Sequence, residues 1–553
     1  MTCKLGLFVL LIVLGGCFDL QDSNDSISGK EASKLEENDS QLNESGDEAC
    51  PLNQIAVDEV CQCQVGLHKK DEYCIDWAET VIKGAEYLEV GFPQEVFLGG
   101  GTFFTPEYMK VGNIDSDPEL EIIYKYGATP PVMAWNHDGS LVDGWPVWSD
   151  TNYYHGKIVL AQLDLDDELE VFIGHEGTAQ TSSSCELNAY NADGSLLSGW
   201  PVKCGSSVTT VPVALDLNGD GIDEVIFDDQ RGLHYIDATG KSTLIEHEEP
   251  LKAGMFNRLE WDGISTGNLD SDPENEFVII SEEFQYSDGL PYSTYIRKVY
   301  VLDSDFSVME GSPVKIKGSR GSSPVIGDLD GDGNNEIAFF GTSNLERTIE
   351  SGIFSSISII SVDGKLKNEI HFDKWIGDDF TDPLTLADLN SDSIPELLFY
   401  DDLSIHAIDM YGREIPGWPV SGFNAFAVGD VDGDKRPDLV TYVAYEEEEP
   451  EYKNRGKMKL AIYKDDGKIK DIEVSITPAR DNGEMFSVIP IIRDIDLDGR
   501  NEVIVNGDYV GGVSGLFPQI WVFDFGGEDH GAVEWGQEFS DESNSNYYSP
   551  VYP

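Results

Sequence analysis

Basic residues are scarce in this chain of 553 residues. It holds 36 Lys and Arg against 103 Asp and Glu, so that its formal net charge is −67. Proteins that bind nucleic acid carry clustered basic residues against the phosphates, and no basic stripe occurs here. The composition therefore excludes nucleic acid as an expected partner. The acidity suits solubility in salty surroundings or repulsion of anionic surfaces.

Familiar catalytic motifs are also missing. The sequence has no G-x-S-x-G, no H-E-x-x-H and no Walker loop, and its nine histidines are scattered without the spacing of metal ligands. We therefore name no catalytic residue and expect a protein without enzymatic activity, while keeping an enzyme as the alternative.

Long hydrophobic runs are absent except at the N-terminus. Residues 1–16 combine Lys4 with an apolar run that is too short to span a bilayer, which predicts a secretory signal peptide. The residues Leu14-Gly15-Gly16-Cys17 resemble the lipobox of bacterial lipoproteins. The resemblance implies that Cys17 is lipidated and anchors the chain in a bacterial cell envelope, at the outer membrane or cell surface. The alternative is an ordinary signal that is cleaved at small residues.

Residues 17–49 begin with this cysteine and continue as a Ser-, Asn-, Asp- and Glu-rich stretch with almost no large apolar side chain. Such a segment cannot bury enough apolar surface to fold. We expect a disordered acidic linker that tethers the following domains to the anchor.

Cysteines are few, eight in all, and four of them crowd residues 50–78. The pattern Cys61-x-Cys63-x-x-Gly66…Cys74 resembles the C-terminal part of an EGF-like module, although the first cysteine pair of that module is missing. The resemblance implies the disulfides Cys50–Cys61 and Cys63–Cys74. A zinc site is the alternative, which the C-x-C spacing and secretion both disfavour.

Two further cysteines, Cys185 and Cys204, lie symmetrically about Asp193-Gly194, a typical hairpin turn. Antiparallel pairing through that turn would place them opposite each other, as a cross-strand disulfide requires. We expect a structural disulfide between them.

Acidic residues are concentrated in one recurring kind of loop. Between Gly327 and Ile337, Asp328, Asp330, Asp332 and Glu336 place four carboxylates within nine residues. Each pair of like charges about 5 Å apart costs on the order of 1 kcal/mol in water. Hard oxygen ligands at flexible spacing predict that the loop closes around Ca²⁺.

The same pattern occurs eight times, at starting positions 42 to 64 residues apart, which indicates an array of similar units. Gln162 stands at the first position of the second copy, so we expect that site to bind most weakly. Arg436 and Arg500 stand where only a backbone carbonyl is needed. The predicted ligands of up to eight Ca²⁺ ions are Asn113, Asp115, Asp117 and Glu121; Asp164, Asp166 and Glu170; Asp216, Asn218, Asp220 and Glu224; Asn268, Asp270, Asp272 and Glu276; Asp328, Asp330, Asp332 and Glu336; Asp388, Asn390, Asp392 and Glu396; Asp430, Asp432, Asp434 and Asp438; and Asp494, Asp496, Asp498 and Glu502.

An EF-hand also opens with Asp-x-Asp-x-Asp-Gly, but its last acidic ligand is at position twelve and helices flank it. Here the acid is at position nine, and apolar, β-branched residues flank the loop. Each loop is therefore expected to join two strands.

From about residue 86 onward the chain repeats one unit. Each copy predicts two strands around the acidic loop, then a third strand, a tight turn such as Asp363-Gly364 and a fourth strand that often reads Gly-Trp-Pro-Val. Four short strands repeated radially describe the blade of a β-propeller. We expect Trp145, Trp200 and Trp418 to pack between blades, and the C-terminal stretch from Trp535 to seal the last blade.

These loops and their spacing resemble the FG-GAP/VCBS repeat propellers, a family that includes the head of the integrin α subunit. The resemblance covers residues 86–553. It implies an all-β, calcium-binding and monomeric propeller with eight four-stranded blades, or seven and an accessory unit, whose first strands line a central channel.

Three functions fit this picture. The first is a non-catalytic binding or adhesion module for an extracellular protein or glycan, carried on the variable second-to-third strand connections. The second is a carbohydrate-active enzyme, because some eight-bladed calcium propellers that resemble this chain are polysaccharide lyases. The third is a structural subunit of an envelope complex. In each case the membrane is reached through the lipid anchor only.

Overall fold

The structure is a computed structural model, and the chain divides into the units Met1–Pro51 and Leu52–Pro553. All described residues belong to the second unit. They are residues 54–57, 60–63, 67–70, 73–76, 87–92, 94–95, 107–126, 131–148, 158–166, 168–174, 186–203, 208, 211–228, 232–245, 264–270, 274–285, 294–317, 323–342, 355–374, 384–401, 403–423, 425–444, 458–468, 474–476, 489–511, 515–527, 530–537, 540–541 and 543–551.

Two short hairpins precede the repeated part. They pair β1 (Gln54–Val57) with β2 (Val60–Cys63), and β3 (Leu67–Lys70) with β4 (Tyr73–Asp76). The predicted lipidation and disulfides stay predictions, because Cys17, Cys50, Cys185 and Cys204 lie outside the described residues, and Cys61, Cys63 and Cys74 are described only by their backbone. Within the part of the chain that is described, no helix has the length and apolar character needed to cross a membrane.

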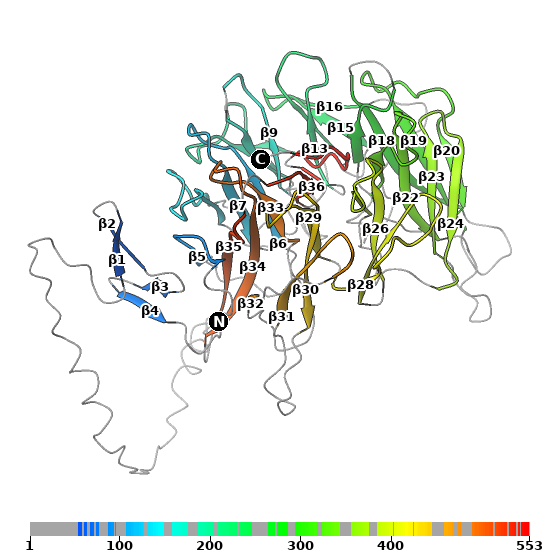
Figure 1. Ribbon diagram of the computed structural model, residues 1–553. Coiled ribbons are helices and arrows are strands. Elements are labelled where there is room, and N and C mark those ends of the chain that lie inside the picture. Colours follow the sequence, from blue (N-terminus) through cyan, green and yellow to red (C-terminus); the bar gives the residue numbers. More distant parts are fainter. Residues whose placement is uncertain are drawn as a thin grey trace, which may run out of the picture. The chain divides into compact units, whose positions relative to one another are not determined.

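The remaining strands form eight antiparallel sheets, which follow one another in chain order around a ring (Figure 1). Blade one holds β6 (Glu107–Gly112), β7 (Glu121–Tyr126) and β8 (Val132–Trp135); blade two holds β9 (Ile158–Ala161), β10 (Glu170–Ile173), β11 (Glu186–Tyr190) and β12 (Val202–Lys203); blade three holds β13 (Val213–Leu215), β14 (Glu224–Asp228), β15 (Leu233–Ile236) and β16 (Ser242–Leu244). Blade four holds β17 (Ile264–Gly267), β18 (Glu276–Gln285), β19 (Thr294–Leu302) and β20 (Val314–Lys317); blade five holds β21 (Val325–Gly327), β22 (Glu336–Thr342), β23 (Ser355–Ser361) and β24 (Leu366–His371). Blade six holds β25 (Thr385–Ala387), β26 (Glu396–Asp401), β27 (Ser404–Ile408) and β28 (Val420–Ser421); blade seven holds β29 (Phe426–Gly429), β30 (Asp438–Ala444), β31 (Met458–Tyr463) and β32 (Val474–Ile476); blade eight holds β33 (Ile491–Arg493), β34 (Glu502–Gly511), β35 (Gly515–Phe523) and β5 (Gln94–Glu95). The prediction of an all-β propeller with eight blades is confirmed.

After its first residue, an acid, the second strand of a blade is mainly apolar. Such a strand suits the middle of a blade, because the neighbouring blades cover both of its faces. In blade two, every residue of β10 is buried. Val171 of that strand packs in one cluster with Ile123 of blade one, and Phe172 packs in another with Val225 of blade three. Continuous apolar runs are typical of strands that are buried on both faces.

The repeated tryptophans connect neighbouring blades, as predicted. Trp145, Trp200 and Trp418 are only 6 to 7% exposed. The indole nitrogen of each donates a hydrogen bond to a backbone carbonyl in the third-to-fourth turn of the next blade, at 2.8, 3.2 and 3.1 Å. The glycine before each tryptophan permits this approach: at Gly417, with φ of +101°, a Cβ atom would lie 2.0 Å from the carbonyl oxygen of Asp466.

The N-terminal part of the propeller closes the ring, which corrects the prediction that the C-terminal stretch seals the last blade. β5 pairs with β35 as the outer strand of blade eight, through Glu95 opposite Gln519 and Gln94 opposite Ile520. Leu88 also bridges to Phe523. The strand that completes the last blade therefore comes from the beginning of the domain.

The C-terminal residues 530–551 instead follow the inner wall of the ring and contact every blade. Within them, β36 (Val533–Trp535) pairs with β29 of blade seven, and Val551 returns to pair with Val533. In the other blades, the segment meets the first strand or residues adjoining that strand. Its hydrogen bonds join Gly536 to Ile492, Gln537 to Val111, Asp541 to Lys110, Asn544 to Ile158 and Pro212, Ser543 to Ala214, Ser545 to Thr266, Asn546 to Ile326, and Glu534 to Asp388.

Candidate metal centres

The eight acidic loops have one common frame. In every blade the loop joins the first strand to the second, and the position-nine acid is the first residue of the second strand. This acid always pairs with the last residue of the first strand, as Glu336 does with Gly327, so that an eight-residue loop lies between them. Strands and not helices therefore flank the loops, which excludes the EF-hand.

The position-nine acid is held by the backbone in the same way in all eight blades. One carboxylate oxygen accepts a hydrogen bond from the N–H of the residue at position two, at distances of 2.6 to 3.3 Å. The residue at position two is always apolar, for example Ile114 or Leu329. Its side chain enters the core while its N–H holds one oxygen of the acid. The second oxygen meets a side chain in blades three, five and six.

The acid at position one organises the turn. In the loop of blade five, Asp328 accepts hydrogen bonds from the backbone N–H groups of Gly331, Asp332 and Gly333, at 2.7 to 3.1 Å. Gly331 and Gly333 have φ of +74° and +85°, a conformation that glycine adopts without strain. Alternating acids and glycines thus curl the loop around the space between the carboxylates.

Five loops bring three carboxylates together so that one oxygen from each lies within 4.8 Å of the others, and each of these groups could hold a metal ion. The groups are Asp115, Asp117 and Glu121; Asp164, Asp166 and Glu170; Asp328, Asp330 and Asp332; Asp430, Asp432 and Asp438; and Asp494, Asp496 and Glu502. Gln162 at position one of the second loop takes over part of the role of this acid, because its side-chain oxygen accepts from the N–H of Asp164 at 3.1 Å. Its amide nitrogen also donates to the carbonyl of Asp166 at 2.6 Å. That loop therefore keeps its carboxylate group.

Two loops differ because asparagine is at position three. The side-chain nitrogen of Asn218 lies 3.2 Å from Glu224 Oε1, and Asn390 makes the same contact with Glu396. In the loops of blades three and six, the asparagine amide therefore donates a hydrogen bond to Oε1 of the glutamate at position nine. In blade one, the same atom of Glu121 faces two aspartates instead. In the loop of blade four, Asp272 lies outside the described residues, so the arrangement of Asn268, Asp270 and Glu276 stays a prediction.

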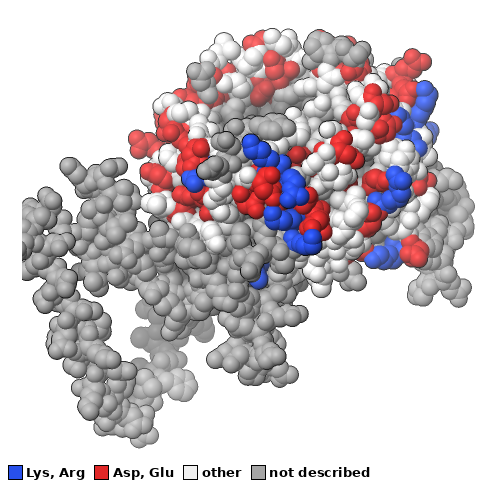
Figure 2. Space-filling model, in the orientation of Figure 1, with Lys and Arg blue, Asp and Glu red and all other residues white. Residues whose placement is uncertain are grey.

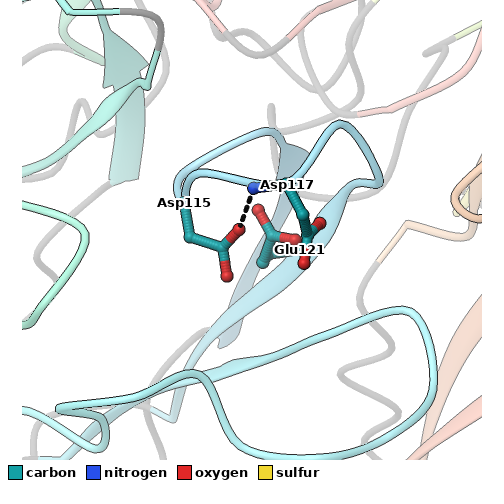
Figure 3. A group of neighbouring side chains, drawn as sticks. All are labelled: Asp115, Asp117 and Glu121. Atoms are coloured by element: carbon teal, nitrogen blue, oxygen red, sulfur yellow. Dashed lines mark hydrogen bonds between the residues drawn. The ribbon is translucent and has the colours of Figure 1, made fainter.

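The loop of blade one shows the clearest need for a cation (Figure 3). Asp115, Asp117 and Glu121 face one another, and the N–H of Asp117 donates to Asp115 at 3.0 Å. Glu121 is 0% exposed, and its Oε1 atom has no hydrogen-bond partner. The buried Oδ1 atom of Asn113 has none either. A buried carboxylate oxygen without a partner is costly, and Ca²⁺ with its preference for oxygen ligands would satisfy it.

Burial acts on several position-nine acids in the same direction. It raises the pKa of Glu170 to about 7, of Glu121 and Glu396 to about 8, and of Glu502 to about 9, and the neighbouring aspartates of each loop add to the effect. A low-dielectric site disfavours the charged form of an acid unless a cation is near. A bound divalent ion would return these groups to the carboxylate form.

Lysines reach into two of the loops, which the sequence reasoning missed. In blade five the ammonium of Lys367 on β24 lies 2.8 Å from Asp330 Oδ2, 3.2 Å from Glu336 Oε1 and 3.5 Å from Asp332 Oδ2. In blade seven, Lys464 Nζ lies 2.8 Å from Asp434 and 3.6 Å from Asp432. Figure 2 shows basic side chains directly beside acidic ones on the visible face. Lysine within the third-to-fourth hairpin was the available signal, because that hairpin reaches the same face as the acidic loop.

The loop of blade eight is the third acidic loop that contacts a basic side chain, after those of blades five and seven. There Arg500, at position seven, pairs with Asp498 and lies 3.1 Å from Asp524. Asp498 is turned toward the arginine, whereas Asp494, Asp496 and Glu502 form the carboxylate group. The arginine therefore neutralises the edge of this loop and leaves its centre acidic.

No protein family model and no curated protein matches the sequence. Solved structures of similar fold include the V. cholerae biofilm matrix protein Bap1, with 14% identity over 80% of this chain and 82% of that chain and a TM-score of 0.32. They also include the exotype rhamnogalacturonan lyase YesX (14% identity, 81% and 96% coverage, TM-score 0.42) and the rhamnogalacturonan lyase PL11 of Bacillus licheniformis (13%, 81% and 97%, TM-score 0.38). Similarities of this size leave the function of the present chain open.

Proposed function

We propose that this protein is a calcium-binding propeller that acts as a non-catalytic binding module. The observation that carries the proposal is the loop of blade one, where the buried Glu121 Oε1 faces Asp115 and Asp117 without a hydrogen-bond partner. Asp115, Asp117, Glu121 and the Asn113 side-chain oxygen are the groups that would hold the ion. Bound Ca²⁺ would supply the positive charge that these oxygens lack.

The loop residues would stiffen the ring rather than act on a substrate. Glu121 begins β7 and is held by the N–H of Ile114, so an ion on its other oxygen connects the turn to both strands of the hairpin. The same frame recurs in every blade. A rigid ring with fixed inner hairpins suits a scaffold whose other loops bind partners.

The face opposite the acidic loops is the one that we propose for binding a protein or glycan. There the hairpins of blades four and eight extend furthest, with pairing that continues to Gln285 opposite Thr294 and to Gly511 opposite Gly515. The connections of blades five and seven on this side, 343–354 and 445–457, lie outside the described residues. Their length and variety in the sequence support the proposal.

We also propose that Cys17 carries lipid, that residues 17–49 tether the propeller to a bacterial envelope, and that this is the only contact with the membrane. Incorporation of labelled palmitate into the full chain tests this, with Cys17→Ala as the control that should lose the label. Labelling that persists in Cys17→Ala would contradict the anchor.

Calcium titration of the full chain by calorimetry tests the metal assignment. We expect Glu121→Gln to remove one site, because it removes the buried one of the three carboxylates that would hold the ion. Asp143→Asn, an exposed acid of the same blade outside the loop, is the matched control and should leave the number of sites unchanged. An identical titration for Glu121→Gln and the wild type would overturn the assignment.

Screening against glycan and protein arrays, with calcium and with EDTA, tests the binding role. We expect ligand binding that chelation weakens. Incubation with acidic polysaccharides, followed by ultraviolet absorbance, distinguishes a lyase, because elimination creates an unsaturated product. Appearance of that product would show that the protein is an enzyme and would overturn the proposal of a non-catalytic binding module.

A further inference from the structure

The acidic loop of blade five, one of three with four carboxylates at the ligand positions, already contains a cation. In blade five, the ammonium of Lys367 lies within 3.5 Å of oxygens from Asp330, Asp332 and Glu336. Two of these distances, 2.8 and 3.2 Å, are hydrogen-bond distances for a charged pair. Glu336 is only 1% exposed at its side chain and Lys367 is 30% exposed, so solvent screens the contact only in part.

The position of Lys367 in the fold explains why it reaches the loop. It belongs to β24, the outer strand of blade five, which follows the turn at Asp363-Gly364 on the same face as the acidic loop. Lys365, two residues earlier, pairs instead with Asp363 of its own turn, and its side chain is 79% exposed. Of these two lysines, only Lys367 contacts the carboxylates of the acidic loop.

The loops of blades one and five differ at the second oxygen of the acid at position nine. There Glu121 Oε1 lacks a hydrogen-bond partner, whereas the matching Oε1 atom of Glu336 meets the Lys367 ammonium. The backbone holds the other oxygen of both acids in the same way, at 2.8 and 3.0 Å. The two loops thus share a frame and differ in whether a side-chain cation is present.

We propose that Lys367 is a resident counter-ion that sets the metal affinity of the blade-five loop, so that this loop holds its shape without calcium and binds calcium weakly. The inference deepens the proposed function and rests on it, because it assigns the metal to loops such as that of blade one. The ammonium and a divalent cation require the same oxygens. Calcium could enter only if Lys367 moves away, and the nearby positive charge would oppose it.

Blade seven carries a second example of the arrangement. Lys464 belongs to the hairpin that follows β31 and lies 2.8 Å from Asp434 and 3.6 Å from Asp432. It contacts the edge of that loop, because Asp430 and Asp438 remain grouped with Asp432. We therefore expect a smaller effect of Lys464 than of Lys367.

Calcium titration of full-length variants tests the role of Lys367. Lys367→Met keeps the length of the side chain and removes its charge, and we expect it to add one site or to tighten one site by about tenfold or more. Lys367→Arg keeps the charge and should behave as the wild type. Lys365→Met is the matched control from the same strand-turn unit and should change nothing. Adding Asp332→Asn to Lys367→Met should abolish the gain, which places the new site in this loop.

Melting curves in EDTA give a second measurement, which does not require that a variant binds calcium. Lys367→Met should melt below Lys365→Met in EDTA, and calcium should remove the difference. An unchanged titration for Lys367→Met, while Glu121→Gln loses a site, would overturn the resident counter-ion alone. A tight site in the wild type that Asp330→Asn removes would also overturn it. If neither the wild type nor any variant binds calcium, both proposals fail.

Discussion

The loops of blades one and five are held by the same strand frame and differ in their electrostatics. Both connect the first and second strands, and in both the backbone N–H of the apolar residue at position two holds the glutamate at position nine. The blade-five loop has four carboxylates at its ligand positions and the blade-one loop has three. Yet it is Glu121 of blade one that keeps a buried oxygen without a partner, while Lys367 satisfies Glu336. The number of acids in a loop therefore does not give the net charge at its centre.

The difference arises from a strand that the loop pattern does not include. The cation of blade five comes from β24, about thirty residues after the loop, and reaches it because both ends of the blade share one face. The electrostatics of each loop depend on its whole blade.

The largest effect should come from removing the metal altogether. Ca²⁺ bound only by the folded protein stabilises it by RT ln(1+[L]/Kd) per site, which is about 2.7 kcal/mol at a hundredfold excess over Kd. With several sites of the blade-one kind, EDTA should lower the Tm by many degrees in calorimetry. An unchanged Tm would mean that the loops of both kinds are closed without metal, and the comparison would lose its basis.

A smaller effect should appear in the dependence of stability on pH without metal. The pKa of Glu121 is raised to about 8 in the fold, above its value in the unfolded chain, so the folded state retains a proton that the unfolded state releases between about pH 5 and pH 8. Stability in EDTA should therefore fall through this range as pH rises, by about 1 to 3 kcal/mol. Chemical denaturation at several pH values measures it.

Glu121→Gln should partly flatten this pH profile, since it removes one of the buried acids that titrate in this range. Glu336→Gln should flatten it less, because hydrogen bonding to Lys367 opposes the rise of the Glu336 pKa. In saturating calcium the fall should vanish for the wild type. Equal flattening by the two substitutions would show that the two loops are electrostatically alike.

The smallest effect should be a difference of sign between two aspartates at the same loop position. In EDTA, Asp115→Asn should stabilise the protein by about 0.5 to 1 kcal/mol, because it relieves repulsion from Asp117 and Glu121. Asp330→Asn should destabilise it by a similar amount, because it weakens the contact with Lys367. Equilibrium unfolding in urea resolves both changes, and the same sign for both would contradict the contrast.

Much of the ring could be predicted from the sequence. The acid at position nine recurs in every blade and a turn glycine in nearly all of them, and each depends on short-range geometry: the acid begins a strand and the glycine turns a hairpin. The packing of Trp145, Trp200 and Trp418 could be predicted because a large apolar side chain that recurs at one position of several units meets the next unit each time. Periodicity carried these predictions.

Contacts between distant parts of the chain could not be predicted in this way. β5 has no acidic loop or turn beside it, so nothing in its residues indicated that it would pair with β35. The C-terminal segment follows the last blade in the sequence, whereas its backbone and side chains bond to the inner strands of the whole ring. The contact of Lys367 could not be predicted either, because a lysine on an outer strand is usually solvated. The first two features depend on closure of the ring and the third on the packing of a whole blade, and no local pattern encodes either.

The two ends of the domain impose an order on its assembly during synthesis. β5 leaves the ribosome long before its partner β35, and residues 530–551, which bond to every blade, are made after all the blades. A nascent chain can form single blades but cannot complete the ring until these residues have been made. A chain arrested before Val533 would leave the first strands of all the blades without their inner neighbour, and we expect such products to be targets for proteases and chaperones.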